Sequence, residues 1–113
     1  MNGQELATAV QHGGKSIIVL LNNGMYGTIR MHQEREYPTH VSGSSLSNPD
    51  FAALARAYGY AGTRITTTAE FEPALLQALA RAEGTVIEIM LDPEVITTRA
   101  TLQTIQQAAL QKR

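Results

Sequence analysis

The chain has 113 residues, of which 43% are hydrophobic and 17% charged, and its formal net charge is -1. These values predict one small globular domain and exclude a general electrostatic attraction to nucleic acid or to membranes. The sequence contains no cysteine, which excludes disulfides, thiolate metal sites and cysteine nucleophiles. No stretch reaches the roughly 20 apolar residues of a membrane span, and no signal peptide is visible. We therefore expect a cytoplasmic protein without nucleic-acid or membrane partners.

The first predicted element is a helix at the start of the chain. Asn2, followed three positions later by Glu5, is a capping-box arrangement. Apolar residues then recur at helical spacing, and the pair Gly13-Gly14 ends the helix.

Residues 16–21 predict the strand around which the chain is organised. The run is almost entirely aliphatic, as is typical of a strand buried on both faces of a parallel sheet. It ends in Asn22-Asn23-Gly24. Buried amides are costly unless they are bonded, and open α/β sheets bind ligands just past the carboxyl ends of their strands. We expect a polar-ligand or metal site there, although Asn-Gly is also a common turn dipeptide.

The next segment is compatible with a helix over residues 26–36, and its charged run 33–36 is expected to face solvent. A long irregular segment over residues 37–48 follows, and a loop of this length is usually functional or mobile. Asn48 is then predicted as an N-cap, with Pro49 at the first position of a helix that ends at Gly59.

The remaining elements alternate between strand and helix. A short strand is predicted over 60–66 and a third strand over 85–91, with a helix between them that starts at the capping box of Thr67 and Glu70. The expected buried face of that helix comprises Phe71, Leu75, Ala78, Leu79 and Ala82. A glutamine-rich last helix is expected over 98–111. This order predicts an α/β fold, with a parallel sheet and helices on both faces.

The junction after the first strand has the features of a binding site for phosphate and metal. A strand–glycine–helix junction places free backbone N–H groups and the positive end of a helix where a phosphate can bind. Amide and carbonyl oxygens are ligands that Mg²⁺ accepts.

The segment from Leu20 to Arg30, with its Asn22-Asn23-Gly24 core, resembles the closing half of the thiamine-diphosphate motif. That motif opens with Gly-Asp-Gly after one strand and closes with Asn-Asn after the next. The family includes acetolactate synthases and benzoylformate decarboxylases. The segments 1–6, 48–55 and 86–89 resemble its flanking parts, so the likeness covers most of the chain.

The resemblance implies a thiamine-diphosphate-binding fold, thiamine diphosphate and Mg²⁺ as cofactors, and a 2-keto acid as the small-molecule substrate. It implies that the Asn23 side chain and the Met25 backbone carbonyl are Mg²⁺ ligands. The cofactor-binding positions that it implies are Asn23, Gly24, Met25, Tyr26, Gly27 and Ile29. Because Ile29 cannot transfer protons, the resemblance favours a carboligase over a simple decarboxylase. No catalytic side chain is predicted.

The departures from the family pattern are equally specific. Gly-Asp-Gly is absent, and its aspartate would lie just upstream of Met1. The glutamate that activates the cofactor's aminopyrimidine is also missing. We therefore interpret residues 1–113 as a partial diphosphate-binding domain that is inactive alone, and leave open whether another domain holds FAD. An uncovered sheet edge would favour a homo-oligomer, which a monodisperse monomer in light scattering would contradict.

Other polar residues have ordinary explanations. His12, His32 and His40 lack metal-ligand spacing, and Asp50 and Glu70 fit helix starts. The alternative to the cofactor hypothesis is a non-catalytic α/β module that binds a partner or a nucleotide and uses Asn22-Asn23 only as a turn. The reading frame upstream of Met1 would discriminate between the two.

Overall fold

The computed structural model describes residues 2–112. Arg113 lies outside the described residues, and so does Met1, the first residue of the segment 1–6 that resembles the family. The chain divides into two compact units. The sheet unit comprises Met1–Asn22 and Asn48–Met90, and the helical-pair unit comprises Asn23–Ser47 and Leu91–Arg113. The chain therefore passes between the units after residues 22, 47 and 90.

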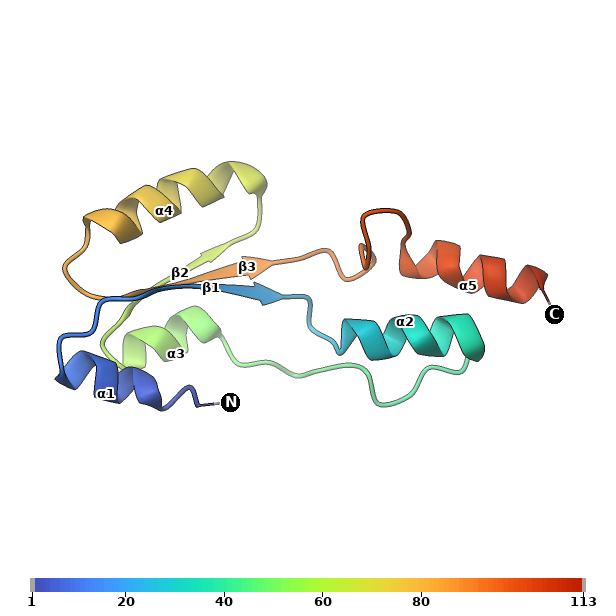
Figure 1. Ribbon diagram of the computed structural model, residues 1–113, viewed down its shortest axis with the longest axis horizontal. Coiled ribbons are helices and arrows are strands. Elements are labelled where there is room, and N and C mark those ends of the chain that lie inside the picture. Colours follow the sequence, from blue (N-terminus) through green and yellow to red (C-terminus); the bar gives the residue numbers. More distant parts are fainter. Residues whose placement is uncertain (1, 113) are drawn as a thin grey trace. The chain divides into compact units, whose positions relative to one another are not determined.

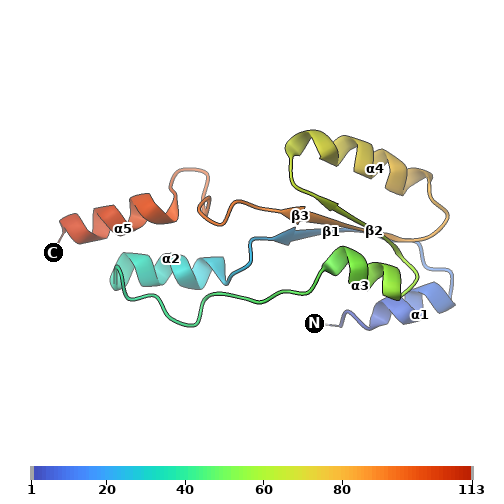
Figure 2. The same ribbon diagram turned by 180° about the vertical axis from the view of Figure 1, so that it is seen from behind.

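The sheet unit is built on three parallel strands in the order β1-β3-β2 (Figure 1). The strands are β1 (Ile17–Asn22), β2 (Ala61–Ile65) and β3 (Thr85–Met90). On one face lie α1 (Glu5–Gln11) and α3 (Phe51–Ala57), and on the other lies α4 (Phe71–Ala80), preceded by the 3-10 turn η1 (Thr68–Glu70) (Figure 2). This arrangement confirms the predicted α/β fold with a parallel sheet and helices on both faces.

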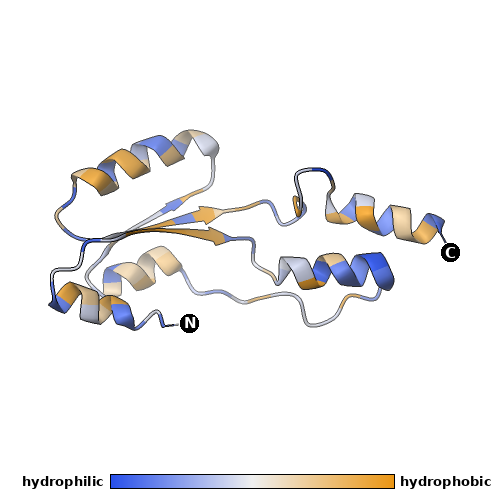
Figure 3. Ribbon diagram, in the orientation of Figure 1, coloured by the Kyte–Doolittle hydropathy of each residue, from blue (hydrophilic) through white to orange (hydrophobic). Residues whose placement is uncertain are grey.

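The position of β1 corrects the prediction that it is buried on both faces. β1 pairs with β3 alone and forms an edge of the three-stranded sheet. Val19 and Leu21 point to the α4 face, and they are 44% and 64% exposed. The central strand is β3, in which Val86 and Ile87 are buried. An aliphatic run alone does not distinguish an edge strand from a central strand, because both are hydrophobic (Figure 3).

Two predicted helix starts are also wrong in detail. The N-cap of α1 is Gln4, and no side chain caps it, so Asn2 and Glu5 do not form a capping box. The N-cap of α3 is Asp50, whose carboxylate accepts a hydrogen bond from the Ala53 N–H at 2.7 Å. Asn48 lies outside the helix because its side chain donates to Asn22 instead.

The start of α4 follows the sequence prediction. Thr67 and Glu70 form the predicted capping box on η1, and α4 continues from it. The small residues Ala74 and Ala78 pack on the sheet in a cluster with Ile65 and Ile87. Leu79, predicted to be buried, is 58% exposed. The narrow sheet therefore covers only part of the apolar surface of α4.

The helical-pair unit contains α2 (Gly27–Glu36) and α5 (Leu102–Gln111), which pack against each other. Both helices were predicted, and the segment between Glu36 and Ser47 is irregular as expected. Figure 3 shows that α2 is mostly hydrophilic. The prediction that residues 33–36 face solvent is wrong for Glu34, which is only 1% exposed. Its carboxylate accepts hydrogen bonds from Arg30 at 2.9 Å and from the Gln106 side chain of α5 at 2.7 Å.

Candidate metal and diphosphate site

The two asparagines at the end of β1 have different surroundings. Asn22 is 6% exposed, and both ends of its amide are hydrogen-bonded within the sheet unit. Its Nδ2 donates to Glu88 Oε1 at 2.8 Å, and its Oδ1 accepts from Asn48 Nδ2 at 2.9 Å. Asn22 is therefore a structural residue at the strand end.

Asn23 opens a tight turn in the helical-pair unit. Its Oδ1 accepts a hydrogen bond from the Met25 N–H at 3.3 Å, so the side chain folds back over the next two residues. Between them, Gly24 adopts a φ of +67°, a left-handed conformation that glycine reaches without a steric penalty. The turn thus places the Asn23 amide oxygen and the Met25 backbone in one short loop, as the resemblance implies for two ligands of one ion.

The irregular segment holds this turn from the side. Met25 and Ser45 form an antiparallel bridge, in which the Tyr26 N–H donates to the Ser44 carbonyl at 2.8 Å and the Leu46 N–H donates to the Gly24 carbonyl at 2.9 Å. The Met25 carbonyl takes part in neither of these two bonds. The bridge therefore fixes the turn without using that oxygen.

Gly27 lies where the turn meets α2, close to the ends of two side chains. A Cβ at this position would lie 2.8 Å from Asn23 Nδ2 and 2.7 Å from Ile96 Cδ1. Both distances are shorter than real contacts of a Cβ, so the missing side chain of Gly27 makes room for the Asn23 side chain. Gly27 is also the first residue of α2, whose free N–H groups therefore follow the turn directly.

The predicted cofactor-lining residues Tyr26 and Ile29 are 52% and 51% exposed. Tyr26 is the N-cap of α2, and its carbonyl accepts the Arg30 N–H at 2.9 Å. Both side chains therefore present apolar surface that a bound molecule or a partner segment can cover.

The donors at this turn fit part of a Mg²⁺ site. An amide oxygen and a backbone carbonyl are hard ligands, and Mg²⁺ is commonly held by few protein oxygens together with waters and substrate phosphates. Over residues 2–112, no three His, Asp or Glu side chains are grouped so that they could hold a metal ion. His12, His32 and His40 are all exposed. A divalent ion at the Asn23–Met25 turn would thus depend strongly on the ligand's own oxygens.

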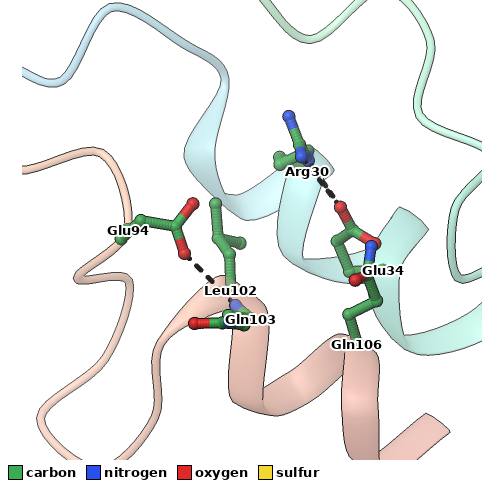
Figure 4. A pocket seen from close by; sticks show the side chains of 6 residues that line it. All are labelled: Arg30, Glu34, Glu94, Leu102, Gln103 and Gln106. Carbon is green, nitrogen blue, oxygen red and sulfur yellow. Dashed lines mark hydrogen bonds and ion pairs between the residues drawn. The ribbon is translucent and has the colours of Figure 1, made fainter. Parts of the chain in front are cut away.

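A polar cavity of about 250 Å³ elsewhere in the helical-pair unit is a weaker candidate (Figure 4). Its lining includes the ion pair of Arg30 and Glu34 at 2.9 Å, and Gln106 donates to the same carboxylate. Glu94 accepts the Gln103 N–H at 3.2 Å. Since these charged groups are bonded to one another, the cavity presents no group that requires a ligand.

Sequence reasoning missed a second polar cluster, centred on Glu88 in β3. This carboxylate is 0% exposed. Besides the bond from Asn22, it accepts the Arg64 Nε–H at 2.9 Å and the Ala52 N–H at 3.3 Å. Arg64 also lies 3.4 Å from Asp50. One signal was available, because a charged residue interrupts the apolar run of β3. A buried charge of this kind requires partners.

The buried carboxylates of Glu34 and Glu88 should make the fold less stable in acid. Burial raises the pKa of each carboxyl, but hydrogen bonds outweigh burial and leave both pKa values below the usual value. The hydrogen bonds to Glu34 come from Gln106, Arg30 and the Thr39 N–H. Those to Glu88 come from Asn22, Arg64 and the Ala52 N–H. A lowered folded-state pKa stabilises the fold above the unfolded pKa, which is about 4.3 for glutamate, and the contribution is lost as the pH falls further.

We therefore expect the urea midpoint to be nearly constant from neutral pH down to about 5 and to fall at lower pH. Circular dichroism at a series of pH values measures it. In Glu88→Gln the fall should be shallower, because one of the linked groups is gone. A midpoint that rises on acidification would contradict this account.

Within the described residues 2–112, no helix combines the length and the apolar character needed to cross a bilayer.

Comparison with known proteins shows relatives that are acetolactate synthase large subunits. Acetolactate synthase large subunits from Haemophilus influenzae and Parasynechococcus marenigrum are 40% and 37% identical to this chain over 81 and 91 residues, or 71% and 79% of it. The isozyme 3 large subunit from Escherichia coli is 40% identical over 85 residues, or 74% of the chain. The chain covers only 14% to 15% of the length of these relatives.

A family model also matches most of the chain. Residues 1–89 match the model of the C-terminal TPP binding domain of thiamine pyrophosphate enzymes. The match includes the whole Asn23–Gly27 turn and extends to β3. The chain therefore belongs to the family of C-terminal thiamine-pyrophosphate-binding domains of thiamine pyrophosphate enzymes.

Proposed function

We propose that the Asn23–Gly27 turn binds the diphosphate of thiamine diphosphate through Mg²⁺, as part of an acetolactate synthase-like enzyme that acts on 2-keto acids. The observation that carries the proposal is the turn itself, in which the Asn23 amide oxygen bonds to the Met25 backbone at 3.3 Å. The turn follows the carboxyl end of a parallel strand, where ligands of open α/β sheets bind.

Each residue of the turn has a distinct role in this proposal. Asn23 Oδ1 and the Met25 carbonyl are the two protein ligands of Mg²⁺. Gly24 and Gly27 permit the backbone to approach the diphosphate, since neither carries a side chain. Tyr26 and Ile29 cover apolar parts of the cofactor. The first N–H groups of α2 add the partial positive charge of a helix N-terminus.

The bound cofactor supplies the electron sink for decarboxylation of the 2-keto acid, and the protein supplies binding and orientation. Ile29 is a hydrocarbon and cannot move a proton, so this position favours transfer of the decarboxylated unit to a second carbonyl over simple release. Acid–base groups and any FAD belong to other parts of the enzyme. The proposed setting is cytoplasmic.

Exposed apolar surface in the sheet unit supports the expected homo-oligomer. Val19 and Leu21 of the edge strand are exposed. A groove of about 420 Å³ lies on the opposite face, and its lining includes Leu6, Ile18 and Leu54. Uncovered sheet edges and apolar patches of this kind are usually covered by another chain.

Calorimetric titration of the purified 113-residue chain with thiamine diphosphate tests the proposal. We expect weak binding that requires Mg²⁺ and disappears in EDTA. Without a carboxylate ligand, the affinity should be about a hundredfold lower than at a site that has one, because a unit charge near the ion is worth a few kcal/mol. We expect no turnover of a 2-keto acid by the chain alone. Turnover would contradict the expected inactivity of the chain alone. Binding that is indifferent to Mg²⁺ would contradict the proposed metal site and favour a partner-binding module.

A further inference from the structure

The buried carboxylate of Glu88 has no part in the proposed binding of cofactor, yet it contacts the residue that precedes the proposed metal ligand. Glu88 Oε1 accepts the Asn22 Nδ2–H at 2.8 Å. Asn22 is the last residue of β1, and Asn23 follows it directly. We propose that Glu88 is a positioning residue that sets the orientation of Asn22 and, through the peptide bond that follows, the geometry of the Asn23–Met25 turn. The inference rests on the proposed function for its link to the metal.

Packing alone does not explain a glutamate at position 88. Position 88 is 0% exposed in the central strand, between Ile87 and Ile89. Replacing buried ion pairs by hydrophobic residues of similar volume is often neutral or stabilising. An apolar side chain, however, would leave the Asn22 amide and the Ala52 N–H without their acceptor. The carboxylate is therefore needed as the hydrogen-bond acceptor for the Asn22 amide and the Ala52 N–H.

The Glu88 cluster also joins separate parts of the chain at the end of the sheet. Asn48 Nδ2 donates to Asn22 Oδ1 at 2.9 Å, so the residues on either side of segment 23–47 are bonded to each other. Glu88 holds Asn22 from the central strand, and its second oxygen accepts the Ala52 N–H in the first turn of α3. Both the Nδ2 and the Oδ1 of the Asn22 side chain thus have a partner.

The charge of Glu88 determines the direction of these hydrogen bonds. Glu88 accepts from Asn22, Arg64 and Ala52, and an ionised carboxylate is an acceptor at both oxygens. Glutamine has nearly the same shape but carries one NH₂ group, which would face a donor. In Glu88→Gln, either one bond is lost or the Asn22 amide turns over, and then Asn48 must turn as well.

The test uses the ¹⁵N-labelled 113-residue chain, with Mn²⁺ as the metal probe. In Glu88→Gln we expect the side-chain NH₂ signal of Asn22 and the backbone signals of Asn23 and Met25 to move, and the Mn²⁺ affinity of the turn to fall about tenfold. The matched control is Glu34→Gln, which removes the other buried carboxylate with a lowered pKa. It should lower the urea midpoint to a similar extent and leave the Asn22 and Asn23 signals in place.

Two further variants keep the test decisive if Glu88→Gln folds poorly. The double variant Glu88→Gln with Arg64→Gln also removes the arginine that is paired with the Glu88 carboxylate. Asn48→Ala deletes only the second hydrogen bond of the Asn22 side chain. Both should still shift the Asn23 and Met25 signals. The proposal is overturned if the folded variants lose stability but leave these signals and the Mn²⁺ affinity as in Glu34→Gln. A wild-type chain that binds no Mn²⁺ would instead contradict the metal assignment, because the signal shifts report positioning without metal.

Discussion

Gly62→Ala is expected to destabilise the chain by about 3 kcal/mol or more, at the upper end of what overpacking costs. Gly62 lies in β2 beneath α3, and a Cβ there would overlap the Ala52 carbonyl oxygen and approach the Ala52 Cα to 3.0 Å. The obstacle is backbone, which no rotamer change can move away. Ala52 is also 2% exposed and hydrogen-bonded to Glu88 through its N–H.

Urea denaturation followed by circular dichroism measures this loss. A small domain has a total stability of only about 5–15 kcal/mol, so the variant should unfold at a markedly lower urea concentration. Gly3→Ala is the matched control, because a Cβ at Gly3 meets no atom within 4 Å. Equal midpoints for the two variants would show that α3 does not pack against β2 as described.

Substitutions of Asn23 should change metal binding in opposite directions. Asn23→Ala removes the only side-chain ligand proposed for the turn, and Mn²⁺ binding should fall below detection. Asn23→Asp replaces the amide oxygen by a carboxylate, and the added charge should strengthen Mn²⁺ binding by about tenfold or more, since each 1.4 kcal/mol is tenfold.

Electron paramagnetic resonance of free Mn²⁺ gives these affinities directly. Gln103→Ala, a substitution at an exposed residue of α5, is the control and should bind as the wild type does. If Asn23→Ala and Asn23→Asp bind Mn²⁺ equally well, the side chain at position 23 is not a ligand, and the metal assignment fails.

Much of the fold could be predicted from local pattern. Glycines, prolines and capping residues mark where elements end, so the strands and most helices were predicted within a few residues. The capping box at Thr67 and Glu70 is an example, because its two partners are only three residues apart. This pair needs no partner from a distant part of the chain.

Errors arose where a distant partner decides the outcome. Asn48 was predicted as an N-cap on local grounds, but its side chain bonds to Asn22, 26 residues away. Glu34 was assigned to solvent because its neighbours are charged, yet α5 covers it through Gln106, 72 residues away. The edge position of β1 likewise depends on strand order, which hydrophobicity along one strand does not encode.

In the candidate site too, local features could be predicted and contacts with distant residues could not. Asn23 and Met25 were predicted as ligands from resemblance, and they share one short turn. That they bind metal stays a prediction. Asn22, which was not among the predicted ligands, is bonded to Glu88. The Glu88 cluster joins β1, β3, β2 and α3, so the sequence offered only the interruption of an apolar strand as its sign.

The most direct test of the metal assignment is paramagnetic relaxation by Mn²⁺ in the ¹⁵N-labelled wild-type chain with thiamine diphosphate present. The account predicts that the backbone signals of Asn23, Gly24 and Met25 broaden first, at Mn²⁺ concentrations that leave α4 and α5 unaffected, and that excess Mg²⁺ restores them. Broadening that begins elsewhere, or that spares these three residues, would contradict the claim that this turn holds the metal.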